Sequence, residues 1–147
     1  MSTLKTSNIQ DTSGNNNSTP EQINQGRAKA WVSFDGGTGT TGQNDVTMLD
    51  SFNVSSVTDD GTGTYTVNFT ANMSNANYAV AGMLANTTTD FASDATSATR
   101  GPVGVFLRGT VAPTTSGVSL ETRYGSTAGH NGAVADFSHV SVVVFGD

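Results

Sequence analysis

The sequence predicts an all-β protein: an antiparallel β-sandwich of seven or eight strands, wound like a jelly roll, with an extended N-terminal arm. Three observations predict this class. Short apolar runs alternate with polar residues along most of the chain, turns rich in glycine and asparagine separate these runs, and no long stretch shows helical periodicity. We expect residues 1–26 to form the arm and residues 27–147 to form the sandwich.

The composition restricts the class of protein. The 147 residues suffice for one domain with a core, and their formal net charge is −6. Because this acidic balance offers no basic surface for phosphates, we expect no nucleic-acid partner. No apolar run is long enough to cross a membrane, and residues 1–5 lack the apolar centre of an export signal, so we expect synthesis in the cytoplasm without membrane insertion. The absence of cysteine excludes disulfides and thiolate metal sites.

The N-terminal arm carries few apolar side chains: Leu4, Ile9 and Ile23. Thr19, Pro20 and Gln22 have the spacing of a capped helix start, which predicts a short helical turn over residues 20–25. Because such an arm buries little surface of its own, we expect other subunits or other proteins to hold it.

The arm leads into a strand over residues 26–34. Its period of two places Ala30, Val32 and Phe34 on a core face and Arg27, Lys29 and Trp31 on the opposite face. A single tryptophan between two cations is unusual for a face that meets only water, so this strand is predicted either to be central in the sandwich or to lie at an interface between subunits. The residues assigned to anchoring and to an oligomer interface are Leu4, Ile9, Ile23, Arg27, Lys29 and Trp31.

The remaining strands follow in order. Residues 48–57 and 65–69 form the clearest hairpin, with a bulge near residues 55–56. The small apolar residues of 78–85 predict a central strand. Residues 103–111 and 118–124 form a second hairpin.

Two details of pairing can also be predicted. In the second hairpin, the alternation of apolar residues places Arg108 directly opposite Glu121. Residues 137–145 are apolar on both faces, which predicts a central strand beside the strand at 29–34.

Two polar segments are the expected contact points with a ligand or a host surface. The loop at 86–101 is long for a compact domain, and the tip at 125–133 is rich in glycine. The candidate residues in or beside these segments are Asp90, Phe91, Asp94, Tyr124 and His130.

No constellation of residues predicts catalysis, a metal site or a cofactor. Paired carboxylates for sugar hydrolysis would come from Asp90, Asp94, Glu121 and Asp136, and none of these lies in a recognisable motif. We therefore expect a protein that is not an enzyme. The aromatic residues offer a second possibility, a platform that stacks on sugars, built from Trp31, Tyr78, Phe91 and Tyr124. Core packing is the preferred interpretation for Trp31 and Tyr78.

Several stretches resemble small structural and tail-fibre proteins in the virions of tailed phages that infect marine bacteria and cyanobacteria. These stretches are Ser-Thr-Leu-Lys at 2–5, Ile-Gln-Asp-Thr-Ser-Gly-Asn at 9–15, Gly-Arg-Ala-Lys-Ala-Trp-Val-Ser-Phe-Asp-Gly at 26–36, and residues 52–69 and 74–85. The resemblance implies no catalytic residues. It implies a structural protein of the virion that is released by lysis of the host, and threefold assembly, which is common among phage appendages.

These expectations combine into one leading hypothesis and two alternatives. The leading hypothesis is a homotrimeric tail fibre or adhesin-like knob that binds other virion proteins through residues 1–26 and serves in host attachment. The first alternative is a decoration protein or fibre on the capsid. The second is a carbohydrate-binding module, with a host surface glycan as its ligand.

Overall fold

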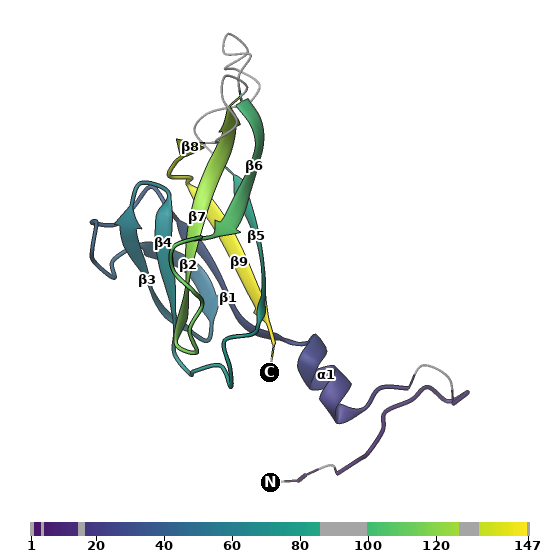
Figure 1. Cartoon of the computed structure of the whole chain (residues 1–147). Coiled ribbons are helices and arrows are strands. Elements are labelled where there is room, and N and C mark those ends of the chain that lie inside the picture. Colours follow the sequence, from purple (N-terminus) through teal and green to yellow (C-terminus); the bar gives the residue numbers. More distant parts are fainter. Residues whose placement is uncertain (1, 4, 15–16, 86–99, 127–132, 147) are drawn as a thin grey trace.

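Two antiparallel sheets pack face to face, which confirms the predicted all-β sandwich (Figure 1). The computed structural model describes residues 2–3, 5–14, 17–85, 100–126 and 133–146, without the side chains of residues 100–103, 124–126 and 133. The first sheet has the order β2-β1-β9-β5 and consists of β1 (Ala28–Asp35), β2 (Thr47–Phe52), β5 (Ala79–Ala85) and β9 (His139–Phe145). The second has the order β3-β4-β7-β6 and consists of β3 (Val54–Gly61), β4 (Thr64–Phe69), β6 (Arg100–Leu107) and β7 (Gly117–Ser126), with the short β8 (Ala133–Val134) beside β7. The jelly-roll winding of the strands stays a prediction.

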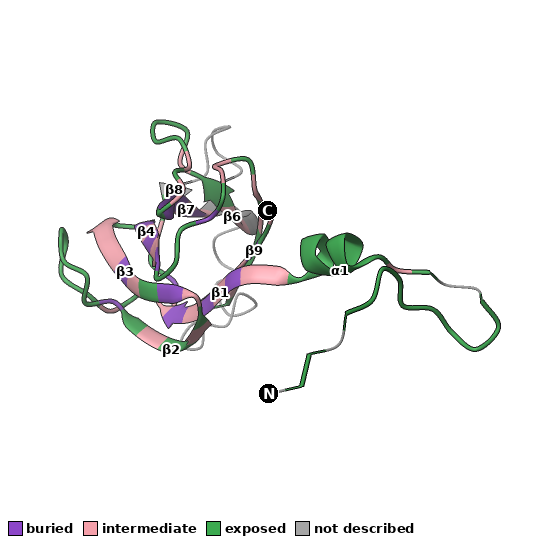
Figure 2. Ribbon diagram, turned by 90° about the horizontal axis from the view of Figure 1, so that it is seen from below, coloured by how far each residue is buried: buried purple, intermediate pink, exposed green. Residues whose placement is uncertain are grey.

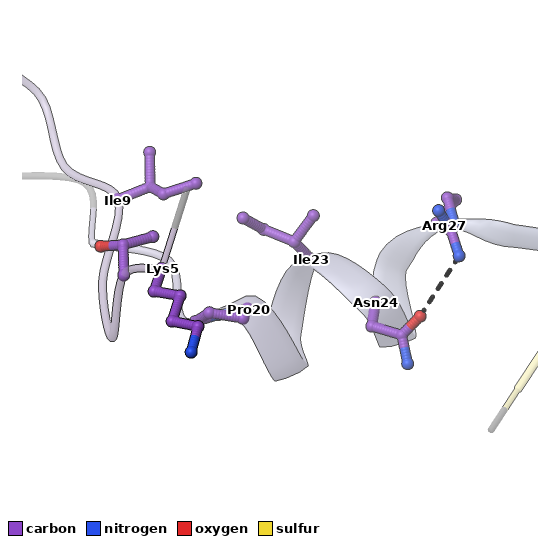
Figure 3. Close-up of a pocket in the computed structure, with 7 residues that line it drawn as sticks. Lys5, Ile9, Pro20, Ile23, Asn24 and Arg27 are labelled. Atoms are coloured by element: carbon purple, nitrogen blue, oxygen red, sulfur yellow. Dashed lines mark hydrogen bonds between the residues drawn. The ribbon is translucent and has the colours of Figure 1, made fainter. Parts of the chain in front are cut away.

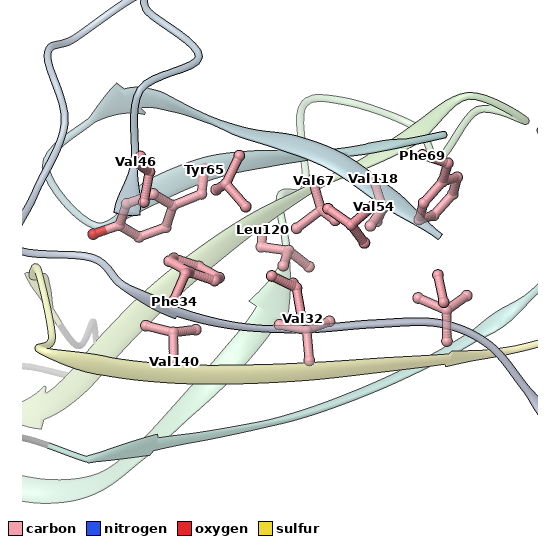
Figure 4. Close-up of a cluster of buried hydrophobic side chains, with 14 of the residues drawn as sticks. Val32, Phe34, Val46, Val54, Tyr65, Val67, Phe69, Val118, Leu120 and Val140 are labelled. Carbon is pink, nitrogen blue, oxygen red and sulfur yellow. The ribbon is translucent and has the colours of Figure 1, made fainter. Parts of the chain in front are cut away.

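The hydrophobic core fills the space between the two sheets. Figure 4 shows side chains from both sheets pointing toward one another, among them Val32, Val140 and Leu120. The aromatic rings of Phe34 and Tyr65 meet edge to face across this core, with centroids 5.1 Å apart. The core face predicted for β1 is therefore confirmed, since Val32 and Phe34 are fully buried.

The first and last strands of the sandwich pair with each other at the centre of the first sheet. Trp31 lies opposite Val143, and Val32 lies opposite Val142. The prediction that residues 137–145 form a central strand is confirmed. The same prediction for residues 78–85 is wrong, because β5 lies at the edge of the sheet. Its small apolar residues reflect an exposed apolar outer face rather than burial on both faces.

The stretch at 48–57 does not form one continuous strand as predicted. Asn53 adopts a positive φ of 55°, which ends β2 in the first sheet and starts β3 in the second. Its side-chain amide donates to the carbonyl oxygens of Lys29 and Ala71, both at 3.1 Å, and fixes this crossing. The hairpin of β3 with β4 and the bulge between Val54 and Ser56 are confirmed.

The second predicted hairpin is confirmed, but its register is displaced by two residues. Phe106, not Arg108, lies opposite Glu121, and the backbone amide of Arg108 donates to the carbonyl of Ser119. The prediction that Arg108 lies directly opposite Glu121 is therefore wrong. Arg108 contacts Asp60 on β3 at 3.5 Å instead. Alternation of apolar residues determines the face of a strand, and it leaves shifts of two residues open.

The hydroxyl of Tyr65 joins three turns at one end of the sandwich. It lies 2.8 Å from the carbonyl oxygen of Gly36 and 2.8 Å from the carboxylate of Asp136. The same carboxylate oxygen accepts the backbone amide of Gly63, whose φ is 62° and whose missing side chain leaves room for Ala135. Burial, followed by the hydrogen bond to Asp136, raises the pKa of Tyr65 well above its ordinary value. The neutral hydroxyl thus stabilises the fold at pH values below the ordinary tyrosine pKa, and this contribution declines as the pH rises further.

We expect Tyr65→Phe to reduce the free energy of unfolding by about 1–3 kcal/mol, because it leaves buried hydrogen-bond partners unsatisfied. Tyr78→Phe is the matched control. The Tyr78 hydroxyl bonds the carbonyl oxygens of Thr114 and Gly117 in a less buried position, so water can replace it, and we expect a loss of about 1 kcal/mol or less. Urea unfolding of the two variants measures both values. Equal losses would contradict this role of Tyr65.

Candidate functional site

The outer faces of the two sheets differ in character. On β3, β4 and β7 of the second sheet, several outward side chains are polar and bond one another. The hydroxyls of Thr66 and Ser119 lie 2.8 Å apart, and the amide of Asn68 donates to the hydroxyls of Ser56 and Thr58 at 3.1 and 2.9 Å. A face whose polar groups are bonded in this way is suited to contact with water.

The outer face of the first sheet is apolar, and it is the candidate functional site. Outward side chains of all four strands contribute to it. We call this surface the apolar face; its residues are Trp31, Phe52, Ala79, Ala81, Met83, Val143 and Phe145. The exposed fraction is 52% for Phe52 and 77% for Met83. Contiguous exposed apolar side chains of this size are typical of contact surfaces, which makes this face the candidate site.

Strand register brings four members of the apolar face into one row. Trp31 pairs with Phe52 on one side and with Val143 on the other, and Val143 pairs in turn with Ala81. Residues directly opposite each other in an antiparallel sheet have adjacent side chains. The row therefore runs without a polar interruption across the whole sheet.

An open hollow lies on the apolar face between β1 and β5. Trp31 and Met83 line its two sides, and Ser33 and Ser141 contribute small polar groups on the intervening surface. The two serine hydroxyls are 3.3 Å apart and bond each other. The hollow thus presents mostly apolar side chains and one bonded pair of hydroxyls to a side chain that enters it.

The arm carries a second exposed apolar cluster. The helix α1 (Pro20–Gly26) begins with a capping box between Thr19 and Gln22, which confirms the predicted helical turn. None of its residues is buried, and Figures 1 and 2 show it projecting from the sandwich. Ile9 and Ile23 lie side by side in Figure 3, with exposed fractions of 50% and 44%.

Two hollows link this cluster to the apolar face. The first is lined by Lys5, Thr6, Ile9, Pro20, Ile23, Asn24 and Arg27 (Figure 3). The second is lined by Arg27, Ala28, Lys29, Phe52, Asn53, Thr70 and Ala71. Arg27 borders both hollows, and Phe52 belongs to the second hollow and to the apolar face. The ammonium of Lys29 donates to the side-chain oxygen of Asn24 at 2.7 Å, which ties the start of β1 to the helix.

Five of the six predicted anchoring and interface residues lie along this continuous surface. Ile9, Ile23 and Arg27 belong to the arm hollow, Lys29 lies at the start of β1, and Trp31 lies on the apolar face. The core interpretation of Trp31 is wrong, because its side chain points outward and is half-buried. Leu4 lies outside the described residues.

Of the other predicted positions, Asp90, Phe91, Asp94 and His130, and the side chain of Tyr124, lie outside the described part of the chain. The core interpretation of Tyr78 is confirmed, since its ring packs against Phe69 with centroids 5.7 Å apart.

Sequence reasoning identified Trp31 and missed the other six members of the apolar face, including the large side chains of Phe52, Met83, Val143 and Phe145. A signal for two of them was present, since residues 137–145 read as apolar on both faces. That pattern alone favours a central strand that is buried on both faces. The outward side chains of β9 instead form the middle of an exposed surface.

Three of the described carboxylates accept hydrogen bonds from neighbouring groups of the fold. Glu121 accepts from the guanidinium of Arg123 at 2.7 Å, and Asp136 accepts from Gly63 and Tyr65. In the loop between β1 and β2, Asp45 accepts the backbone amide of Thr40 at 2.8 Å, which lowers the pKa of Asp45. Within the described ranges, no group of three or more histidine, cysteine or acidic residues is placed to hold a metal ion. No helix in this part of the chain is long and apolar enough to cross a membrane.

Comparisons of this chain with protein-family models, with curated proteins and with solved structures find no match.

If another copy covers the apolar face, the fluorescence of Trp31, the only tryptophan, reports the contact. We expect Met83→Glu to shift its emission to longer wavelength, because an unpaired carboxylate in an apolar contact opposes association and returns Trp31 to water. Thr62→Glu, at an exposed turn of the second sheet, is the control with the same charge change and leaves the emission unchanged. Identical emission of Met83→Glu and the unsubstituted protein would argue against a covered face.

Proposed function

We propose that this chain is a structural protein of a phage virion, a homotrimeric tail fibre or adhesin-like knob that is anchored through residues 1–26. The observation that supports assembly most strongly is the apolar face and its continuity with the arm. Full burial of a side chain such as Phe52 or Met83 stabilises a contact by about 1.5–3 kcal/mol. A surface that carries several such side chains is therefore well suited to a stable contact between copies.

The phage setting of the proposal derives from the resemblance of residues 2–5, 9–15, 26–36, 52–69 and 74–85 to virion proteins. The shape of the molecule is compatible with it. Helix α1 lies at one end of the sandwich, and β6 begins at the opposite end, where β7 also ends (Figure 1). In the proposed knob, the arm binds the particle, and the segments between β5 and β6 and after β7 face the host.

Two features of the arm support the anchoring role. Its helix has seven residues, and an isolated helix shorter than about 12 residues is only marginally stable in water. Its apolar side chains Ile9 and Ile23 are exposed on the same side. Both features suit a segment that is held by another virion protein.

One observation favours the carbohydrate-binding alternative. Trp31 and Phe52 are neighbours on the outer face of the first sheet, and aromatic rings in such a position can stack on the apolar faces of sugars. This alternative predicts a monomer that binds a polysaccharide. The apolar row that continues through Val143 to Ala81 offers few hydrogen-bonding groups for sugar hydroxyls, so the geometry supports the contact between copies better.

Gold-labelled antibody against this protein, applied to purified particles and viewed by electron microscopy, tests the proposed function. We expect label at the tail, because the knob is proposed to be a fibre component. Label over the head would favour the decoration protein on the capsid. Particles without label would contradict a role in the virion and would leave the carbohydrate-binding module as the better account. A second antibody against a major tail protein shows that the tails are accessible.

A further inference from the structure

A second exposed apolar patch lies on β6, at the edge of the second sheet. Phe106, Leu107 and the nearby Val111 have exposed fractions of 51%, 48% and 40%. Phe106 points to the outer face, and its ring lies over Gly104, whose missing side chain makes room for it. Leu107, the next residue, points to the opposite side of this edge strand, because it pairs with the core residue Leu120. We call Phe106, Leu107 and Val111 the edge patch. It belongs to a different sheet from the apolar face.

Symmetry relates these two surfaces. In a ring of three copies, every contact joins two different surfaces of the chain, because only a twofold contact pairs a surface with itself. The proposed homotrimer therefore needs a second surface that fits the apolar face. Among the described residues outside the apolar face and the arm, the edge patch combines the exposed Phe106 and Leu107 at the end of an edge strand with the exposed Val111 of the following turn.

The two surfaces are complementary in shape and charge. The hollow between Trp31 and Met83 can receive a large apolar side chain, and Phe106 is a large aromatic side chain with half of its surface exposed. Asp50 lies on the outer side of β2, in the row that crosses the first sheet through Ser33 to Ser141. Arg108 directly follows β6, and its guanidinium lies on the outer side of the second sheet, where it contacts the carboxylate of Asp60 at 3.5 Å.

We propose that the edge patch of one copy binds the apolar face of the next copy, with Phe106 in the hollow between Trp31 and Met83. Arg108 of the first copy then approaches Asp50 of the second. This inference rests on the proposed homotrimer and adds the identity of its second surface. The contact repeats three times around the ring, so each copy uses both surfaces and both become buried.

Cross-linking of engineered cysteines tests this contact, since the natural chain has no cysteine. The Met83→Cys variant is made with an affinity tag and the Val111→Cys variant without one. The two full-length chains are then co-expressed. A short bismaleimide is then added. We expect a linked dimer of one tagged and one untagged chain. Because the two cysteines are on separate chains, a link within one chain cannot produce this band.

Each variant alone and one further pair serve as controls. Met83→Cys alone and Val111→Cys alone are expected to give no linked dimer. The pair Met83→Cys with Thr62→Cys, at the exposed turn between β3 and β4, is expected to give none either. Light scattering of each unlinked mixture measures the size of the assembly.

The possible failures are distinct. A trimer that forms no link between positions 83 and 111 would overturn the assignment of the edge patch, while the homotrimer stands. Linked dimer from Met83→Cys alone would place position 83 beside its own equivalent at a twofold or threefold axis and would overturn the assignment of the edge patch, while light scattering decides whether the homotrimer stands. A monomer by light scattering would overturn both the assignment of the edge patch and the homotrimer.

Discussion

The pairing of β1 with β9 is the contact on which the rest of the structure depends. It joins the start of the sandwich to its end, and its alternating side chains contribute to two surfaces at once. Val32 and Val142 face the core, whereas Trp31 and Val143 face outward. The strands that flank this pair, β2 and β5, extend both surfaces. The same ladder places Ala28 opposite Phe145, so the arm leaves the sandwich beside the end of the chain.

The outer faces of the two sheets differ in their side chains. The outward hydroxyl and amide groups of the second sheet bond one another, as in the contact of Thr66 with Ser119. The first sheet presents Phe52, Trp31 and Val143 in a row instead. Because apolar surface of this extent is stabilised by removal from water, the asymmetry is the physical basis of the assembly that we propose. The chemistry of the described carboxylates, which serve turns and strand contacts, is compatible with a structural role.

The sequence predicts much of the fold, because alternation of apolar residues reports directly on strand faces. It predicted the class, the inward set of β1, the capped helix and the pairing of the first and last strands. It failed where the pattern is degenerate. The register that displaced Arg108 by two residues keeps every side chain on its face, so alternation cannot detect the shift. The positive φ of Asn53 separates two strands that read as one, and a single asparagine is a weak signal for such a break.

The candidate site was only half predictable, for a related reason. A strand that is apolar on both faces is equally consistent with a central position and with an exposed apolar surface. Strand β9 is central and also contributes to the exposed apolar surface, whereas β5 contributes to that surface from the edge of the sheet. Trp31 was found because two cations flank it in the sequence. Phe52 and Met83 have no such marker, and only the register across four strands brings them beside Trp31.

Sedimentation equilibrium of the full-length chain tests most directly whether the apolar face is covered by other copies. We predict a mass three times that of the 15.1 kDa chain, because three copies each bury one apolar face. We also predict a return to the mass of one chain in Val143→Lys, which places a charge in the middle of the row from Phe52 to Ala81. An unsubstituted chain that sediments as a monomer at every concentration would contradict the proposal.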